Sequence, residues 1–213
     1  MTKKQVIELI ELLKVYYPDA KCSLNFKNSF EMVISVMLSA QCTDERVNKT
    51  TPSLFAKYST PEAFAKAPLS DIEELIKPCG FHKTKAKHIK DLSAMLLESY
   101  NGLVPNSMNE LIKLPGIGRK SANVIMLEAF NTPIGIAVDT HVKRVATRIG
   151  LSKQSDPLKI EQDLLKLIPS KYIADINHIF IWHGRLTCKA INPKCSTCPI
   201  SSLCTYNKKN GSA

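Results

Sequence analysis

Apolar residues recur at helical spacing along this chain, and this periodicity limits the possible folds more than any other feature. The residues between Val6 and Leu13 follow it until Tyr17-Pro18 stops the pattern. The run from Phe30 to Cys42 is apolar on nearly every side and is too long for an average strand. Strand-like alternation is confined to the short stretch 134–138. The pattern predicts an all-α fold of about ten helices joined by short turns.

Several helix starts are marked by residues that cap helices. Ser70 and Ser107 each stand three residues before a glutamate, Glu73 and Glu110, in the pattern of a capping box. Asp156 precedes a proline, which is well suited to the first position of a helix. We therefore expect helices to begin directly after Ser70, Ser107 and Asp156.

The charge balance of the chain is strongly basic. Lys and Arg number 29 against 19 for Asp and Glu, which gives a formal net charge of +10 and points to polyanionic partners such as nucleic acid or an anionic membrane. With 44% hydrophobic and 23% charged residues, the composition is that of a globular protein and excludes a disordered tail or a collagen. No apolar run reaches the roughly 18 residues of a membrane helix. Glu8 and Glu11 interrupt the N-terminal apolar residues, so we expect no signal peptide.

Two of the eight glycines lie two residues apart in the segment LPGIGRKSANVI. Glycine permits a tight turn and lets backbone amides approach a phosphate oxygen, and the N-terminus of a following helix adds unpaired N–H groups. A helix–hairpin–helix that grips the nucleic-acid backbone is therefore predicted, although a plain turn between packed helices is the simpler alternative. The basic residues that follow and the net charge favour binding. The residues expected to contact DNA are Leu114, Gly116, Ile117, Gly118 and Arg119.

Four cysteines crowd near the C-terminus in the spacing C-x6-C-x2-C-x5-C. A loop of this length can wrap one cofactor, and both structural zinc and iron–sulfur clusters accept four thiolates. A single C-x2-C pair with longer arms favours a cuboidal cluster, because zinc ribbons usually use two such pairs. We expect a [4Fe–4S] cluster with the ligands Cys188, Cys195, Cys198 and Cys204.

The other cysteines lie far away in the sequence. Their surroundings are apolar, so we expect Cys22, Cys42 and Cys79 to be small buried residues. An odd total of seven is unusual for an oxidised secreted framework. A reducing compartment, the cytoplasm with its nucleoid, is the expected location.

In combination, five segments resemble the endonuclease III family of DNA glycosylases. Three are LPGIGRKSANVI, VDTHVKRVATRIG and HGRLTC with its three following cysteines, and MLSAQCTDERVNK and GFHKTKAKHI are similar to further parts of that family. The resemblance covers almost the whole chain. It implies two all-α domains with a cleft between them: a six-helix barrel over residues 22–132, and an iron–sulfur domain built from 1–21 and 133–213. From the residues alone, Asn131-Thr132-Pro133 is the best candidate for a border.

The resemblance also assigns the catalytic residues. The lysine that follows the hairpin is Lys120, and the aspartate that opens the VDTH segment is Asp139. An amine can attack the sugar C1′ and form a Schiff base once it has lost its proton, which partial burial would favour. A carboxylate can assist that deprotonation and stabilise a cationic sugar. Without the resemblance, Lys120 would be interpreted as a surface charge and Asp139 as a helix cap.

Family members fill the gap left by a flipped nucleotide with a glutamine and an apolar wedge. These positions correspond to Gln41 and Phe81, where the relatives more often have leucine at the second position, and His82 stands where tyrosine is common. Phe81 is equally suited to a core. The basic residues that follow are expected to contact phosphates or to form a solvated helix face; they are Lys83, Lys85, Lys87, His88 and Lys90.

The resemblance implies a bifunctional glycosylase and abasic-site lyase that removes oxidised pyrimidines and nicks the strand by β-elimination. Its partner is double-stranded DNA that contains damaged pyrimidines or abasic sites, with no membrane and with the protein acting as a monomer. The alternatives are a non-catalytic DNA-binding module, an adenine or mismatch glycosylase of the same superfamily, and a ferredoxin-like electron carrier. A carrier needs neither the net charge of +10 nor the glycine hairpin.

Overall fold

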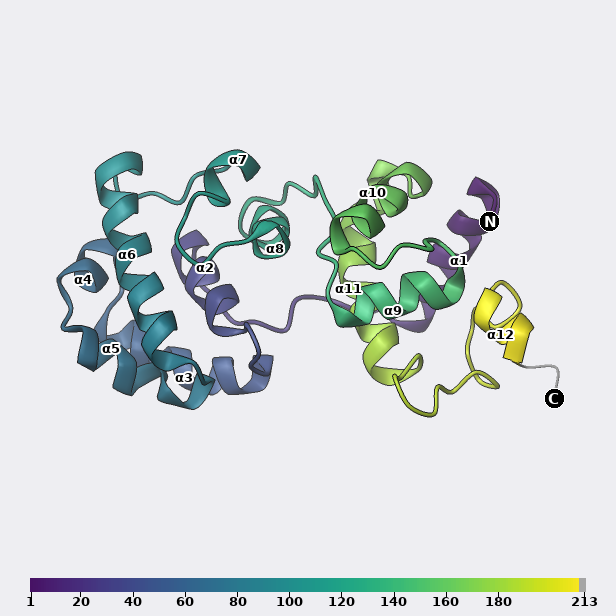
Figure 1. Ribbon diagram of the computed structural model, residues 1–213, viewed down its shortest axis with the longest axis horizontal. Coiled ribbons are helices and arrows are strands. Elements are labelled where there is room, and N and C mark those ends of the chain that lie inside the picture. Colours follow the sequence, from purple (N-terminus) through teal and green to yellow (C-terminus); the bar gives the residue numbers. More distant parts are fainter. Residues whose placement is uncertain (211–213) are drawn as a thin grey trace. The chain divides into compact units, whose positions relative to one another are not determined.

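The computed structural model describes residues 1–210, and all regular structure in this part of the chain is helical, as predicted (Figure 1). The stretch 134–138 forms no strand and contains a bend at Gly135. None of the helices in residues 1–210 has both the length and the apolar character needed to cross a bilayer. The elements in chain order are α1 (Lys3–Tyr16), α2 (Ser29–Leu38), α3 (Asp44–Lys57), α4 (Pro61–Lys66), α5 (Leu69–Ile76), the 3₁₀ turn η1 (Lys77–Cys79), α6 (His82–Tyr100), α7 (Met108–Leu111), α8 (Arg119–Phe130), α9 (Thr140–Ile149), α10 (Pro157–Leu167), the 3₁₀ turn η2 (Ser170–Tyr172), α11 (Ile173–Leu186) and α12 (Thr205–Asn210).

The chain divides into two compact units. One is the continuous segment Ser23–Thr132, and the other combines Met1–Cys22 with the chain from Pro133 onward. In the continuous unit, α2 is almost fully buried and packs on α8, α3 and α6. Its burial agrees with the apolar run that begins at Phe30, although the helix ends at Leu38 rather than at Cys42.

The discontinuous unit joins the two ends of the sequence around one core. Helix α1 buries its apolar stripe against α11, and the Lys14 ammonium donates to the Asp175 carboxylate at 2.7 Å. Helix α9 packs on α11 as well, with α10 and α12 against it. The core of this unit includes Leu9, Ile149 and Phe180, each at most 1% exposed. Contacts between residues very far apart in the sequence therefore hold this unit together.

The predicted helix starts are partly correct. The Asp156 carboxylate accepts the Lys159 N–H at 3.0 Å, and Pro157 is the first residue of α10. Ser107 does precede α7, but its side chain makes no capping hydrogen bond. The prediction for Ser70 is wrong, because α5 begins at Leu69, two residues earlier than expected and directly after Pro68. A proline before a helix fixes the backbone without any capping side chain.

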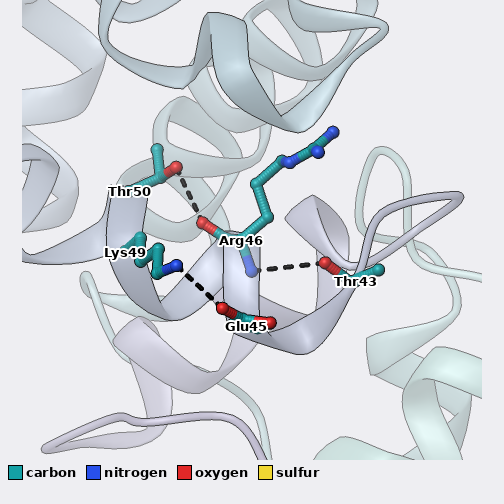
Figure 2. Close-up of polar contacts among 5 residues, drawn as sticks. All are labelled: Thr43, Glu45, Arg46, Lys49 and Thr50. Atoms are coloured by element: carbon teal, nitrogen blue, oxygen red, sulfur yellow. Dashed lines mark hydrogen bonds and ion pairs between the residues drawn. The ribbon is translucent and has the colours of Figure 1, made fainter.

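Helix α3 starts with a capping hydrogen bond that the sequence analysis did not use. The Thr43 hydroxyl accepts the Arg46 N–H at 3.3 Å, and the Thr50 hydroxyl donates to the Arg46 carbonyl at 2.9 Å (Figure 2). The cap fixes the end of the loop that carries Gln41. The other contact in this view is a surface ion pair at 2.7 Å between Glu45 and Lys49.

Candidate functional site

The predicted hairpin connects α7 to α8. Leu114 and Ile117 anchor its turn, with 2% and 4% of their surfaces exposed, and the Ile117 N–H donates to the Leu114 carbonyl at 3.1 Å. Gly116 has a φ of +78°, in the left-handed region that favours glycine, whereas Gly118 is extended with φ −94° and ψ 174°. Both glycines are exposed. Apolar anchors on one side thus leave the glycine backbone accessible on the other.

The two glycines differ in what a side chain would meet. A Cβ on Gly116 would lie 3.0 Å from Nδ1 of His88, on α6, and would also be strained by the positive φ. A Cβ on Gly118 would have no neighbour within 4 Å. Gly116 is therefore required by the fold of the hairpin, while nothing within the protein requires Gly118.

Helix α8 begins at an exposed position with several groups that attract anions. Its N-cap is Gly118, which has no side chain to accept the first-turn amides. Such amides point outward and, with the helix dipole, favour an anion. Arg119 and Lys120 occupy this first turn, and both side chains are exposed. The partial burial expected for Lys120 is wrong, since this end of α8 lies at the surface.

Asp139 lies in the discontinuous unit, at the start of α9. Its Oδ1 accepts the Val142 N–H at 2.7 Å, so the residue caps α9. The backbone just before it is buried, and the Ala137 N–H donates to Oδ1 of Asn177 at 2.8 Å. These bonds hold the half-buried carboxylate in one place. Capping is compatible with catalysis because a cap fixes the direction of the carboxylate.

Gln41 and Phe81 follow the ends of two elements in the continuous unit, α2 and η1. Both adopt the left-handed backbone conformation, with φ of 53° and 46°. For a residue other than glycine this conformation costs roughly 1–2 kcal/mol. Phe81 is 64% exposed, so the alternative of a core aromatic does not hold. Exposed side chains on strained backbone are a common property of functional positions.

The basic stretch at the start of α6 has two kinds of lysine. Lys83 and Lys87 are exposed, as a phosphate contact requires. Lys85 is only 5% exposed, and its ammonium donates to three backbone carbonyls. Lys90 is half-buried and donates to two. The expected phosphate contacts are therefore wrong for Lys85 and Lys90, whose ammonium groups are used within the protein.

The four C-terminal cysteines line one small cavity. Apolar walls from Ile149 and Ile200 accompany them. Within residues 1–210, no three His, Cys, Asp or Glu side chains converge on a point suited to a single metal ion. The cavity holds four soft sulfur ligands around a shared space, which is the donor set that an iron–sulfur cluster uses; the ligands are Cys188, Cys195, Cys198 and Cys204.

Hydrogen-bond donors surround these sulfurs. Arg148 Nη1 donates to Cys188 Sγ at 3.6 Å and to the Lys189 carbonyl at 2.6 Å. His183 Nε2 lies 3.9 Å from Cys198 Sγ. Donors to the sulfurs of a cluster stabilise its negative charge. The surroundings of the cavity thus fit a four-thiolate cluster.

A buried polar chain leads from His183 to the N-terminal helix. The Tyr17 hydroxyl lies 3.1 Å from His183 Nδ1 and 2.6 Å from the Thr187 hydroxyl. Burial lowers the pKa of His183 to about 4, so the ring is neutral at physiological pH. The tautomer protonated on Nε2 satisfies all contacts, because Nδ1 then accepts from Tyr17 while Nε2–H faces Cys198. Sequence reasoning missed both Tyr17, the C-cap of α1, and His183, a buried residue of α11.

Burial raises the pKa of the Cys198 thiol to about 11, with backbone contact from Ile200 acting in the opposite direction. Burial also raises the pKa of Cys195. Thiols of this kind lose their protons as they bind a metal centre. Of the cysteines outside the cavity, only Cys79 is buried as predicted, and Cys22 and Cys42 are half-buried.

Comparison with known proteins agrees with this arrangement. Residues 34–170 match the model of the HhH-GPD superfamily of base excision DNA repair proteins, and residues 188–204 match the iron–sulfur binding domain of endonuclease III. An endonuclease III from Synechocystis is 45% identical over 202 residues, which cover 95% of this chain and 92% of that protein. One from Bacillus subtilis is 44% identical over 207 residues, covering 97% and 94%.

The same family is found among solved structures. A trapped covalent intermediate of endonuclease III with DNA superposes with a TM-score of 0.92 at 45% identity, and 98% of each chain is covered. Because the superfamily model matches more than half of the residues and the relatives match over nearly their full length, the chain belongs to the endonuclease III family of base excision DNA repair proteins.

Proposed function

We propose that Lys120 and Asp139 are the catalytic residues with which this chain removes damaged pyrimidines from duplex DNA. As a member of the endonuclease III family, the chain is a bifunctional DNA glycosylase and abasic-site lyase of base excision repair. The observation that carries the assignment is the exposed lysine in the first turn of the helix that follows the glycine hairpin.

The reaction requires an amine beside the sugar. The Lys120 Nζ lone pair forms a bond to C1′ while the bond from C1′ to the base breaks, and the base leaves with that electron pair. The nitrogen lone pair then forms the C1′=N bond while the C1′–O4′ bond breaks and O4′ takes up the proton that the nitrogen loses, so the sugar ring opens to an imine. The imine makes the C2′ proton acidic. Loss of this proton forms a C1′–C2′ enamine, and its electron pair expels the 3′ phosphate by breaking the C3′–O bond. Water then hydrolyses the imine and restores Lys120.

Asp139 supplies a carboxylate at a fixed position. It accepts a proton on the way to the neutral amine and stabilises positive charge that develops on the sugar as the base departs. Its hydrogen bond to the Val142 N–H supports this role, because it holds one oxygen and thereby orients the other.

The remaining residues serve binding. The hairpin residues Leu114, Gly116, Ile117, Gly118 and Arg119 contact the DNA backbone, which positions the duplex without reading its sequence. Gln41 and Phe81 fill the gap left by the flipped nucleotide, as their exposure and strained backbones suggest. The continuous unit Ser23–Thr132 corresponds to the six-helix barrel domain, and the protein acts as a monomer on DNA in the cytoplasmic nucleoid.

Borohydride trapping tests this function directly. Borohydride reduces an imine between protein and DNA to a stable amine, so a duplex with one oxidised pyrimidine should yield a covalent adduct of protein and DNA. A duplex with an undamaged pyrimidine is the control. Base release without an adduct would contradict the lyase assignment, and an adduct on the undamaged duplex would contradict the specificity for damaged bases.

The chain carries a [4Fe–4S] cluster, and we propose Cys188, Cys195, Cys198 and Cys204 as its ligands. When bound, the cluster would cross-link the segment 188–204 to itself, since all four ligands lie in this loop. Purified protein should be yellow-brown and contain about four irons per chain. Cys198→Ser should lower both iron content and the yield of folded protein, since metal binding and folding are coupled. Cys22→Ser is the control, and stoichiometric zinc in colourless protein would contradict the assignment.

Gly116 and Gly118 should differ when each is replaced by alanine. Gly118→Ala meets no protein atom, so unfolding free energy should change by less than about 0.5 kcal/mol while affinity for duplex DNA falls, because the methyl group blocks the approach of a phosphate. Gly116→Ala should lower both stability and affinity. Thermal melting and binding titrations at several salt concentrations measure these effects. Undiminished affinity of Gly118→Ala would remove this glycine from the interface.

A further inference from the structure

The Lys85 side chain is buried, and each N–H donor of its ammonium group has an acceptor. Its Nζ donates to the carbonyls of Leu38 and Ala40 at 2.8 Å each and to the Cys79 carbonyl at 2.9 Å. An ammonium group has three N–H donors, so three carbonyls satisfy it completely, whereas a neutral amine could satisfy only two. Burial lowers the pKa of Lys85, while the three carbonyls match the three donors of its charged form.

The three carbonyls lie at the ends of two helical elements. Leu38 is the last residue of α2 and Cys79 is the last residue of η1. The last carbonyls of a helix have no partner within it, and the dipole of α2 favours a cation there. Lys85 thus supplies the missing donors at both ends and connects them through one atom.

The chain leaves these two ends directly into the left-handed residues. Gln41 follows Ala40, and Phe81 follows Cys79 after one glycine, Gly80. Strained backbone persists only where its surroundings fix it. Phe81 has no capping side-chain hydrogen bond of its own at the start of α6. The Lys85 ammonium binds the backbone just before both of these residues.

We propose that Lys85 is a positioning residue that holds the Gln41 and Phe81 loops together in the arrangement needed to fill the gap in a DNA duplex. This inference rests on the proposed function of those two residues. Lys85 acts through them and does not touch DNA, because its side chain is 5% exposed and all of its donors are used. For the same reason it is not an alternative nucleophile to Lys120.

The same helix offers a matched control. The Lys90 ammonium donates to the carbonyls of Ala65 and Ala67, both at 2.6 Å. Ala67 is the C-cap of α4. Lys90 therefore also donates hydrogen bonds to carbonyls at a helix end, but this end leads to neither Gln41 nor Phe81. Substitution of either lysine by methionine removes the charge and retains most of the apolar stem.

The test compares lyase activity on two forms of one oligonucleotide with a single abasic site. In the duplex, the flipped nucleotide leaves a gap in the base stack that must be filled. The single strand has no such gap. Lys85→Met, Lys90→Met, Gln41→Ala and Phe81→Ala are each measured on both forms in the full-length protein. The readout is the ratio of kcat/KM on the duplex to that on the single strand, which a general loss of folded protein does not change.

For Lys85→Met we expect the ratio to fall about 100-fold, the loss that a misplacement of roughly 1 Å can cause. Gln41→Ala and Phe81→Ala should lower it in the same sense, and Lys90→Met should leave it within about 3-fold of wild type. Equal losses on both substrates by Lys85→Met would overturn the inference. A ratio for Lys90→Met that is as low as the ratio for Lys85→Met would also overturn it. If Gln41→Ala and Phe81→Ala keep the wild-type ratio, the gap-filling function itself fails, which is a distinct result.

A second pair of variants covers the case in which Lys85→Met does not fold. Lys85→Gln, which retains two amide donors on a shorter stem, is then measured instead of Lys85→Met. Lys90→Gln is its control. A selective loss on the duplex supports the positioning role. An unchanged ratio for folded Lys85→Gln contradicts it, because the amide cannot donate to all three carbonyls.

Discussion

Lys120→Gln should yield no trapped adduct and no strand cleavage at an abasic site. The amide has no basic lone pair with which to attack C1′, so no imine forms and β-elimination is not activated. The rate of cleavage should fall by at least about 10⁴-fold, to the level without protein. Affinity for duplex DNA should persist, since the glycines and amides of the hairpin are unchanged. Gel analysis after borohydride reduction measures the adduct, and a binding titration measures the affinity.

Lys113→Gln is the control for the loss of a positive charge near the hairpin. Lys113 pairs with Glu110 at 2.8 Å on the surface and is assigned no role in the reaction. It should form adduct at the wild-type rate. Normal adduct formation by Lys120→Gln would show that a different amine reacts, and loss of duplex binding would show that the substitution disrupts the hairpin.

Asp139→Asn should slow base excision by about 10² to 10⁴-fold, the range that general acid–base catalysis supplies. Asparagine is as good an N-cap as aspartate, so the hydrogen bond to the Val142 N–H and the stability of α9 should be retained. Adduct formation on a preformed abasic site should be affected less, because there the base has already left. Single-turnover rates on damaged-base and abasic duplexes separate these two steps.

The matched control is Asp156→Asn, another aspartate that caps a helix of the same unit through the Lys159 N–H. It should excise bases at the wild-type rate. Small and equal effects from Asp139→Asn and Asp156→Asn would leave Asp139 with its capping role alone. A large drop in melting temperature for Asp139→Asn would likewise assign its effect to the fold.

Sequence reasoning located the hairpin and the cysteine loop because each depends on a local pattern. The left-handed φ of Gly116 follows from the tight turn, and the buried Leu114 and Ile117 follow from apolar spacing. What the pattern did not reveal is that Gly118 has an ordinary extended backbone. Both glycines look alike in sequence, and the structure distinguishes them by the positive φ of Gly116 and by its contact with His88.

Lys85 is the clearest case in which the basic composition of a segment led to a wrong prediction. Among five basic residues in a row of charges, it was interpreted with its neighbours as a phosphate contact. Helical periodicity gives a different answer, because Lys85 shares its face with the buried Ile89, Leu92 and Leu96. That spacing indicated burial. Its acceptors come from residues up to 47 positions away, and no local pattern could have identified them.

The cavity was predictable in its ligands but not in its surroundings. Tyr17, His183 and Arg148 come from separate helices, and their contacts with the cysteine loop depend on how those helices pack. The positions of the sulfur ligands follow from spacing within one short segment. Contacts between segments depend on tertiary packing, which cannot be predicted from the local patterns of a single sequence.

The discontinuity of one unit determines the order in which the protein is completed during synthesis. Residues Ser23–Thr132 are continuous, so this unit has all of its partners once its own segment has emerged from the ribosome. The apolar face of helix α1 instead stays uncovered until its partner helix is synthesised, since Asp175, which pairs with Lys14, is 161 residues further along the chain. At an elongation rate of about 5–20 residues per second this delay is on the order of ten seconds. We therefore expect the hairpin with Lys120 to fold on the nascent chain before Asp139 is in place, because the unit that holds Asp139 needs both α1 and α11.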